Sequence, residues 1–273
     1  MRTQRIVMSL AGMLFFCITA LHVSGQTVSP GKQYVDMSRA ERLVFVGEQA
    51  RRIAREMSGS EYEFTADFEK DIQRAVTQYA ERLGKSANER GGRSDLRLVL
   101  ERGQAHAPTL IAAFRARNVA PLFGLYLPFI ESEYQNLDSA SPMGALGMFQ
   151  FLPSTGEHYG LSVEELLDVG KSADAAARYI GNSMQAFAND PMKEALALLA
   201  YNRGVEKTAR ELKVLLNEQN KRCSICALTA DRSKLDETFR HESVFYVPRF
   251  FAAAIIGENP QAFGVRMQPL SSY

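Results

Sequence analysis

The 273-residue chain contains no tryptophan, three cysteines and no excess of charge of either sign. Three cysteines are too few for a disulfide-rich scaffold, and no cluster of metal-ligating side chains is visible. The 32 Lys and Arg residues are balanced by 31 Asp and Glu residues, which leaves a formal charge of +1. A dedicated nucleic-acid-binding protein carries a strong basic excess, so we expect no nucleic acid partner.

Long apolar runs are also missing, except at the N-terminus. Arg2 and Arg5 precede an apolar stretch over residues 6–23, which is the pattern of a secretory signal peptide. We predict a signal peptide over residues 1–25, cleaved after Gly25. An uncleaved membrane anchor is the alternative, because about 18 apolar residues is near the lower limit for a spanning helix. Either interpretation predicts an exported protein, located in the periplasm or the cell envelope.

Export leaves two cysteines in the C-S-I-C sequence of residues 223–226. An oxidising compartment permits a local disulfide between Cys223 and Cys226, and we favour that interpretation. A zinc site would need two more ligands, and His241 is the only histidine nearby. Metal binding and thiol catalysis remain the alternatives.

Strand signals are nearly absent, whereas helical periodicity recurs along the chain. The fold class we expect is therefore all-α. A polar, turn-rich stretch over residues 85–95 separates an N-terminal helical arm, residues 26–95, from the rest of the chain. Residues 195–201 are apolar all round, so the helix that carries them should be buried. Gly59, Gly204 and Gly257 stand where helices should stop, while Pro121 and the pair Asp190-Pro191 stand where helices should begin.

The residue with the clearest chemical potential is Glu131. It directly follows the apolar run of residues 125–130, and partial desolvation there would raise the pKa of its carboxyl toward the range of a general acid. An exposed glutamate at a helix end is the plain alternative. Glu133 lies about 200° further around a helix, so we assign it to the surface.

Four motifs occur in a fixed order along the chain. They are E-S at residues 131–132, S-P-x-G-A-x-G-x-x-Q-F-x-P-S-T-G at residues 141–156, A-Y-N-x-G at residues 200–204 and Y-V-P-R at residues 246–249. Together they resemble the lytic transglycosylases of the goose-type-lysozyme-like superfamily, particularly the membrane-bound lytic transglycosylase D type. The resemblance covers roughly residues 100–265.

This resemblance implies a lysozyme-like helical catalytic domain over residues 96–273, with peptidoglycan glycan strands as substrate and Glu131 as the catalytic acid and base. Members of the family often carry LysM wall-binding repeats, which are not seen here, so peripheral association with the outer membrane or a cell-envelope complex is also considered. Packing remains an alternative role for several of the substrate-binding residues implied by the motifs, which are Ser132, Ser141, Gly147, Met148, Gln150, Tyr201, Asn202 and Tyr246.

One carboxyl suffices for the implied reaction, because the muramyl sugar supplies its own nucleophile and closes a 1,6-anhydro ring. The resemblance therefore implies that no metal and no organic cofactor is needed. Two alternatives remain. A hydrolase of the same fold would need a second acid such as Asp138 to position water. A non-catalytic peptidoglycan-binding scaffold would keep the fold alone. The sequence departs from the usual family motif at Arg203, where a solvated or ion-paired arginine is preferred over one that meets a peptide carboxylate.

Overall fold

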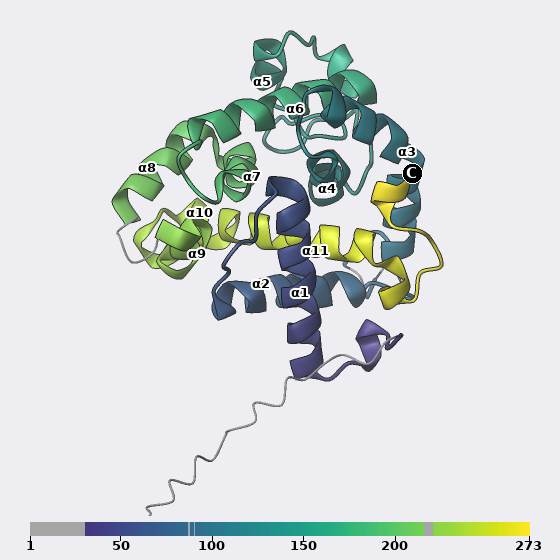
Figure 1. Ribbon diagram of the computed structural model, residues 1–273. Coiled ribbons are helices and arrows are strands. Elements are labelled where there is room, and N and C mark those ends of the chain that lie inside the picture. The colour runs from purple at the N-terminus through teal and green to yellow at the C-terminus, as the bar shows by residue number, and fades with distance from the viewer. Residues whose placement is uncertain (1–30, 87, 90, 216–220) are drawn as a thin grey trace, which may run out of the picture.

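The computed structural model describes residues 31–273, apart from residues 87, 90 and 216–220 (Figure 1). In these residues the chain forms helices and no strand beyond a single bridge between Leu146 and Phe151, so the all-α class is confirmed. The predicted signal peptide lies outside the described residues. The helices are α1 (Arg39–Ser58), α2 (Ala66–Ala80), α3 (Leu96–Ala116), α4 (Pro121–Ser132), α5 (Pro153–His158), α6 (Val169–Ala186), α7 (Lys193–Arg203), α8 (Val205–Leu215), α9 (Ser224–Ala230), α10 (Glu237–His241) and α11 (Tyr246–Glu258).

Helix α11 runs through the middle of the molecule (Figure 1). Its side chains are buried all round with the exception of Arg249, as expected of a helix whose apolar residues are not confined to one stripe. It packs against α2 and α1 from the N-terminal arm and against α4 and α7 from the rest of the chain. The arm and the remaining helices consequently share one hydrophobic core.

The helix boundaries follow most of the sequence signals. Gly59 ends α1 with a φ of 75°, Gly204 ends α7 with a φ of 85°, and Pro121 is the first residue of α4. The predicted start at Asp190 is wrong, because α7 begins at Lys193. The Asp190 side chain instead closes a turn by accepting a hydrogen bond from the backbone N–H of Met192 at 2.8 Å.

Gly257 does not end α11, in contrast to the prediction. The helix continues to Glu258, and a side chain at position 257 would overlap the ring of Tyr126 on α4. The glycine therefore serves the close approach of α4 and α11, which no signal in its local sequence reveals.

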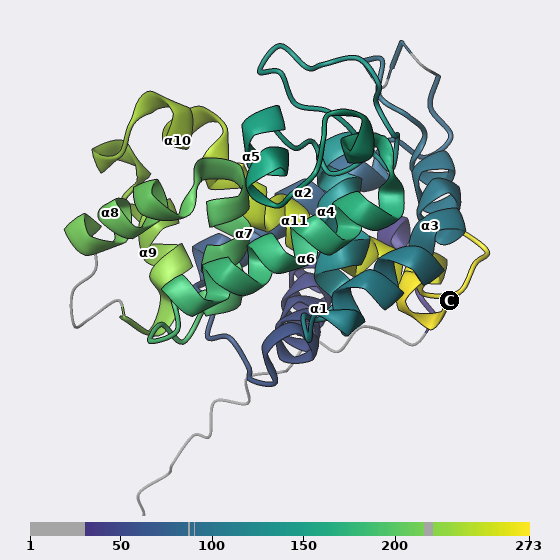
Figure 2. The same cartoon turned by 90° about the horizontal axis from the view of Figure 1, so that it is seen from above.

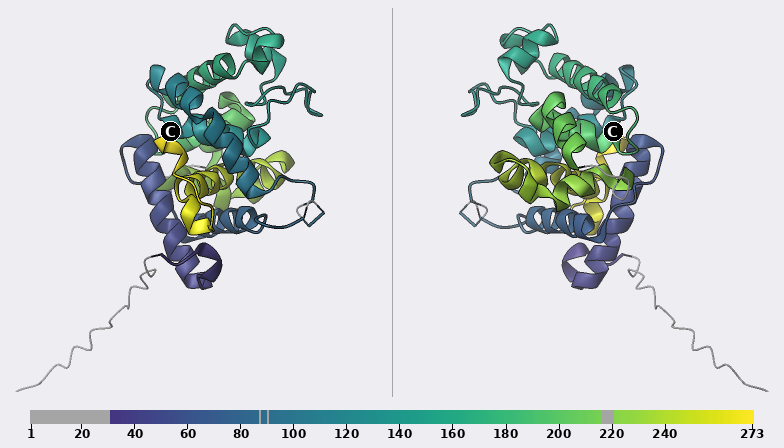
Figure 3. Two further views of the ribbon diagram at one scale, coloured as in Figure 1. Left: turned by 90° about the vertical axis from the view of Figure 1, so that its right-hand side faces the viewer. Right: turned by 90° about the vertical axis from the view of Figure 1, so that its left-hand side faces the viewer.

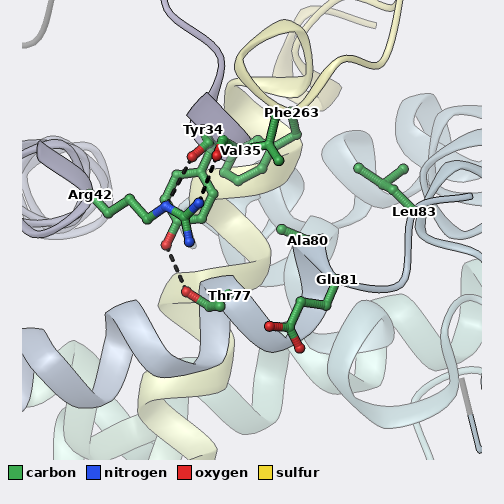
Figure 4. Close-up of a pocket in the computed structure, with 8 residues that line it drawn as sticks. All are labelled: Tyr34, Val35, Arg42, Thr77, Ala80, Glu81, Leu83 and Phe263. Atoms are coloured by element: carbon green, nitrogen blue, oxygen red, sulfur yellow. Dashed lines mark hydrogen bonds between the residues drawn. The ribbon is translucent and has the colours of Figure 1, made fainter. Parts of the chain in front are cut away.

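A short 3-10 turn, η1 (Tyr34–Asp36), is fastened to the arm by side chains of α1 and α2 (Figure 4). Arg42 donates to the carbonyl oxygens of Tyr34 and Val35 at 3.0 and 2.8 Å, and its guanidinium stacks on the Tyr34 ring. The Tyr34 hydroxyl is hydrogen-bonded to the hydroxyl of Thr77 at 2.9 Å. A small pocket of about 270 Å³ remains among these residues.

A disulfide joins Cys223 and Cys226 immediately before and within α9. The sulfur of Cys226 accepts a hydrogen bond of 3.4 Å from the backbone N–H of Thr65, the N-cap residue of α2. The bonded pair thus contacts the beginning of the arm's second helix. In the described part of the chain, no helix combines the length and apolar character needed to span a membrane.

The loop after α2 and the loop after α4 extend from the same side of the molecule, as the views in Figures 2 and 3 agree. Helix α4 ends on this side at Ser132, and the polar residues of both loops are therefore brought toward the end of an apolar helix. This arrangement positions the site described below.

The close contact at Gly257 is testable by substitution. We expect Gly257→Ala to lower the free energy of unfolding by about 1–3 kcal/mol, because the added methyl group forces Tyr126 or α11 to shift. Gly181→Ala in α6 is the matched control: its methyl group would lie 3.7 Å from Val119, an ordinary contact, and we expect a gain of up to about 1 kcal/mol. Urea denaturation measures both. Equal effects of the two substitutions would contradict the packing argument.

Candidate active site

Glu131 lies in the last turn of α4, where an apolar helix reaches the surface. The residues before it are buried, and Glu131 itself is partly buried. The chain leaves the helix through Glu133 and Tyr134, which both adopt the left-handed conformation with φ of 53° and 58°. This sharp exit leaves the Glu131 carboxyl at the helix end rather than covered by a further turn.

The environment of Glu131 is formed mainly by α11. The hydroxyl of Tyr246 donates a hydrogen bond to Oε1 of Glu131, and Nη2 of Arg249 donates to the carbonyl oxygen of Ile130 at 2.9 Å. Burial raises the pKa of Glu131 to about 7, against the opposing effects of the Tyr246 hydrogen bond and the Arg249 charge. The pKa of Tyr246 is raised well above its ordinary value by burial, so its hydroxyl remains a donor at neutral pH.

Glu133 is not a surface charge, and that prediction is wrong. Its carboxylate accepts hydrogen bonds from Nη2 of Arg82 at 2.6 Å and from the backbone N–H of Ser94 at 3.3 Å. The side chain of Arg82 is 6% exposed and that of Glu133 is 20% exposed. The left-handed turn at Glu133 breaks the helical periodicity on which the prediction rested, and the ion pair fastens the loop before α3 to the end of α4.

Two pockets meet at Glu131. The first, of about 550 Å³, lies between the 141–155 loop, the end of α7 and the region of α10. The second, of about 690 Å³, lies between α2, the end of α4 and the start of α11. Glu131, Asn202 and Glu242 line both pockets, so the raised-pKa carboxyl stands where the two pockets adjoin.

The loop that forms one wall of the first pocket is a tight turn closed by the bridge between Leu146 and Phe151. Gly147 has a φ of 74°, and a side chain there would overlap the carbonyl oxygen of Leu166. Gln150 also adopts a positive φ of 50°, and its amide nitrogen donates to the carbonyl oxygen of Gly147 at 2.8 Å. The amide oxygen of Gln150 is left as an acceptor on a residue that lines the pocket.

Asn136, which lies outside the four motifs and was not predicted, holds this loop in place. Its side-chain oxygen accepts from the backbone N–H of Met148 at 3.2 Å, while its nitrogen donates to the carbonyl oxygen of Leu167 at 2.6 Å. A single asparagine outside the quoted motifs carries no sequence signal of such a role. It ties the pocket loop to the segment before α6.

The end of α7 supplies the opposite wall. The Tyr201 hydroxyl donates to the carbonyl oxygen of Phe149 at 2.9 Å. The Asn202 side-chain oxygen accepts from the hydroxyl of Ser243 at 2.6 Å, which leaves its amide N–H groups as donors for the pocket. Of the two roles preferred for Arg203, solvated or ion-paired, the structure shows the second: its side chain is 1% exposed and Nη2 lies 3.0 Å from Asp236. It also pairs with Glu211 on α8.

The structure brings most of the implied site residues to Glu131 but not all. Ser141, Gln150, Tyr201 and Asn202 line the first pocket, and Tyr246 lines the second. Instead of the substrate contact expected of them, three residues are packed inside. The Ser132 hydroxyl donates to the carbonyl oxygen of Met148 at 2.7 Å, and Met148 itself is fully buried. Gly147 packs against the backbone of Leu166. These residues shape the loop but line neither pocket: Ser132, Gly147 and Met148.

Three further pocket residues were not singled out from the sequence. Arg249 belongs to the quoted Y-V-P-R motif, but its contact with Ile130 depends on the packing of α11 against α4. Ser243 and Glu242 precede that motif by a few residues and line the first pocket. Only the nearness of an acid to a motif could have indicated Glu242.

Part of the chain is similar to a known protein family. Residues 109–222 match the family model described as the transglycosylase SLT domain. This part of the chain is similar to a transglycosylase SLT domain. The all-helical fold agrees with the lysozyme-like helical fold that the motifs implied. The matched residues include Glu131 and the first pocket's loop, whereas α2 and α11 lie outside the match.

Two curated relatives, both named membrane-bound lytic murein transglycosylase D, are 26% identical to the chain over 179 residues. They come from Escherichia coli strain K12 and from E. coli O6:H1 strain CFT073. The alignment covers 64% of this chain and 36% of each relative, so the chain spans little more than a third of their length. The name of these relatives and the description of the family model both specify a transglycosylase.

The Tyr246 hydrogen bond has a measurable consequence for Glu131. In Tyr246→Phe the carboxylate loses a donor that favours its charged form, so we expect the pKa of Glu131 to rise above about 7. NMR titration of the side-chain carboxyl carbon measures it. Tyr179→Phe is the control, because that hydroxyl donates to the carbonyl oxygen of Ala200 and its residue also lines the first pocket. A pKa that falls or stays constant in Tyr246→Phe would refute the assignment.

Stability should also depend on the ionisation of Glu131. Its folded pKa of about 7 exceeds the ordinary value of about 4.3, so the folded state binds the proton more tightly than the unfolded state. Below about pH 4.3 the Glu131 carboxyl is protonated in both states and leaves the free energy of unfolding unchanged. As the pH rises from there to about 7, the carboxyl lowers the free energy of unfolding progressively. We therefore expect Glu131→Gln to gain stability over the wild type between pH 5 and 8, measured by denaturation at several pH values. A stability difference that is independent of pH would exclude this linkage.

Proposed function

We propose that the protein is a peptidoglycan lytic transglycosylase that cleaves the β-1,4 bond between N-acetylmuramic acid and N-acetylglucosamine. One observation carries the proposal: a carboxyl with its pKa raised to about 7 stands at the junction of two pockets, on the part of the chain that is similar to an SLT domain. A polymer that is cut inside its chain needs room on both sides of the catalytic group. The two pockets provide that room.

In the first step Glu131 acts as a general acid. At neutral pH a substantial fraction of the carboxyl is protonated, because its pKa lies near the working pH. The proton passes to the glycosidic oxygen, and the bond from that oxygen to the muramyl C1 breaks. The positive charge that develops on the sugar is stabilised by its own N-acetyl group, while the Tyr246 hydroxyl orients the carboxylate that is left behind.

In the second step the same carboxylate acts as a base. It removes the proton from the muramyl C6 hydroxyl, whose oxygen attacks C1 and closes the 1,6-anhydro ring. The proton lost in the first step is thereby recovered and no water is consumed. One carboxyl is sufficient, whereas hydrolysis by the usual route needs a second carboxylate to activate water or to act as nucleophile.

A hydrolase is the second candidate, and one observation bears on it. Asp138, the acid considered from the sequence, is exposed and lines neither pocket. Glu242 lines both pockets together with Glu131, so it is the carboxylate available to position water. A scaffold that binds peptidoglycan without cleaving it is the third candidate, and the experiment below separates all three.

We also infer a location in the cell envelope. The proposed substrate lies there, and the N-terminal sequence predicts export. The two curated relatives are named membrane-bound, which supports the proposal that this protein, too, works at a membrane surface or in an envelope complex. Peptidoglycan glycan strands are the partner we propose, with no cofactor.

The products of purified sacculi distinguish the candidates. We expect wild-type protein to release muropeptides that end in 1,6-anhydro-muramyl groups, and Glu131→Gln to lower their yield by about 10² to 10⁴-fold. Mass spectrometry of the digest measures them. Glu157→Gln, an exposed acid outside the first and second pockets, is the control. Products one water heavier that depend on Glu242 would establish hydrolysis, and binding without any product would establish a scaffold.

A further inference from the structure

The second pocket has one wall that the SLT domain match does not include. This wall is the polar face of α2, where Asp71, Arg74 and Gln78 follow one another at helical spacing and line the pocket. The opposite face of α2 is apolar, with Phe68 and Ile72 buried, and packs along α11. The N-terminal arm thus presents a polar helix face beside Glu131, on the side away from the 141–155 loop.

Arg249 stands on the facing wall of the same pocket. It is exposed, and two of its nitrogens are used: Nη2 donates to the carbonyl oxygen of Ile130 at 2.9 Å, and Nε donates to the Tyr79 hydroxyl at 3.4 Å. It forms no ion pair with a carboxylate of the described residues, in contrast to Arg82 in the same pocket, which is paired with Glu133. A guanidinium has five N–H donors, so Arg249 keeps three for a ligand and is held in place by the other two.

Arg74 supplies a second guanidinium on the wall formed by α2. It pairs with Asp71 at 2.7 Å; the Asp71 side chain is 12% exposed, whereas that of Arg74 is 58% exposed. The guanidinium therefore remains accessible from the pocket and can bind a ligand carboxylate while it stays paired with Asp71. Gln78, also exposed, adds an amide that both donates and accepts hydrogen bonds.

We propose that the second pocket binds the carboxylate-bearing side group of a muramyl sugar, with Arg249 as the fixed donor and Arg74 and Gln78 of the arm as the adaptable ones. The proposal rests on the proposed function for its substrate class. Uncharged glycan lacks this group, so the pocket would distinguish muramyl-containing strands from chitin-like ones. The carboxylate has two sources: the lactyl group of a peptide-free strand and the acidic residues of an attached peptide.

Binding can be measured without cleavage in the full chain that carries Glu131→Gln. Calorimetry would compare three oligosaccharides of equal length: a chitooligosaccharide, a peptide-free strand of alternating N-acetylglucosamine and N-acetylmuramic acid, and the same strand with peptides. We expect the carboxylate-bearing strands to bind about 10 to 100-fold more tightly than the chitooligosaccharide at low salt, as for hydrogen bonds to charged groups. A gain confined to the peptide-free strand identifies the lactyl carboxylate, because an attached peptide converts that group to an amide. A gain confined to the peptide-bearing strand identifies the acidic residues of the peptide, and a gain shared by both strands shows that the pocket accepts either carboxylate.

Variants of the arginines locate the effect. Arg249→Gln should abolish the preference, Arg249→Lys should keep part of it, and Arg74→Gln should reduce it. Arg55→Gln is the matched control, because Arg55 is 57% exposed on α1, pairs with Glu61 and lines neither pocket. Thermal melting of each variant establishes that it is folded. Losses in Arg55→Gln equal to those in Arg74→Gln would overturn the proposal.

Equal affinity for all three oligosaccharides would also overturn it. This outcome is separate from a failure of the proposed function, since binding is measured in a variant that lacks the acid. If the wild type yields no anhydro products from sacculi but the carboxylate preference is present, the pocket assignment stands and the transglycosylase assignment falls. If anhydro products form while all three ligands bind equally, the reverse holds.

Discussion

The site depends on keeping a carboxyl partly buried at the end of an apolar helix while one hydroxyl holds it in position. Burial alone would keep Glu131 protonated over much of the pH range, and an acid that never ionises cannot act as a base. The Tyr246 hydrogen bond and the Arg249 charge oppose burial, and the balance leaves the pKa at about 7. The protein therefore maintains a group that destabilises it at neutral pH, as sites that need perturbed ionisation do.

That balance is fixed by α11, which is also the packing centre of the fold. The helix carries Tyr246 and Arg249 toward Glu131 while its apolar side chains contact α1, α2, α4 and α7. The bond from Arg249 to the carbonyl oxygen of Ile130 joins α11 to α4 one residue before the acid. A shift of α11 in the core would thus displace the donor and the charge together, so core packing and the ionisation of Glu131 are coupled.

Sequence reasoning recovered the all-α class and several helix ends, because proline at a helix start and glycine at a stop act locally. The motif resemblance also indicated Gln150, Tyr201 and Asn202, which the fold gathers beside Glu131. It failed where a distant partner decides the outcome. Glu133 is paired with Arg82, 51 residues away, and Gly257 accommodates a ring from another helix. Such long-range contacts leave no trace in local periodicity.

The two faces of α2 separate the proposed recognition of ligand from the packing that supports the proposed chemistry. Its apolar face, including Phe68 and Ile72, supports α11 and through it the environment of Glu131. Its exposed face, with Arg74 and Gln78, lines the second pocket and contributes little to packing. Exposed substitutions usually change stability by no more than about 0.5 kcal/mol. The polar face of the arm can therefore vary with the ligand, while the acid and its hydroxyl partner keep their positions.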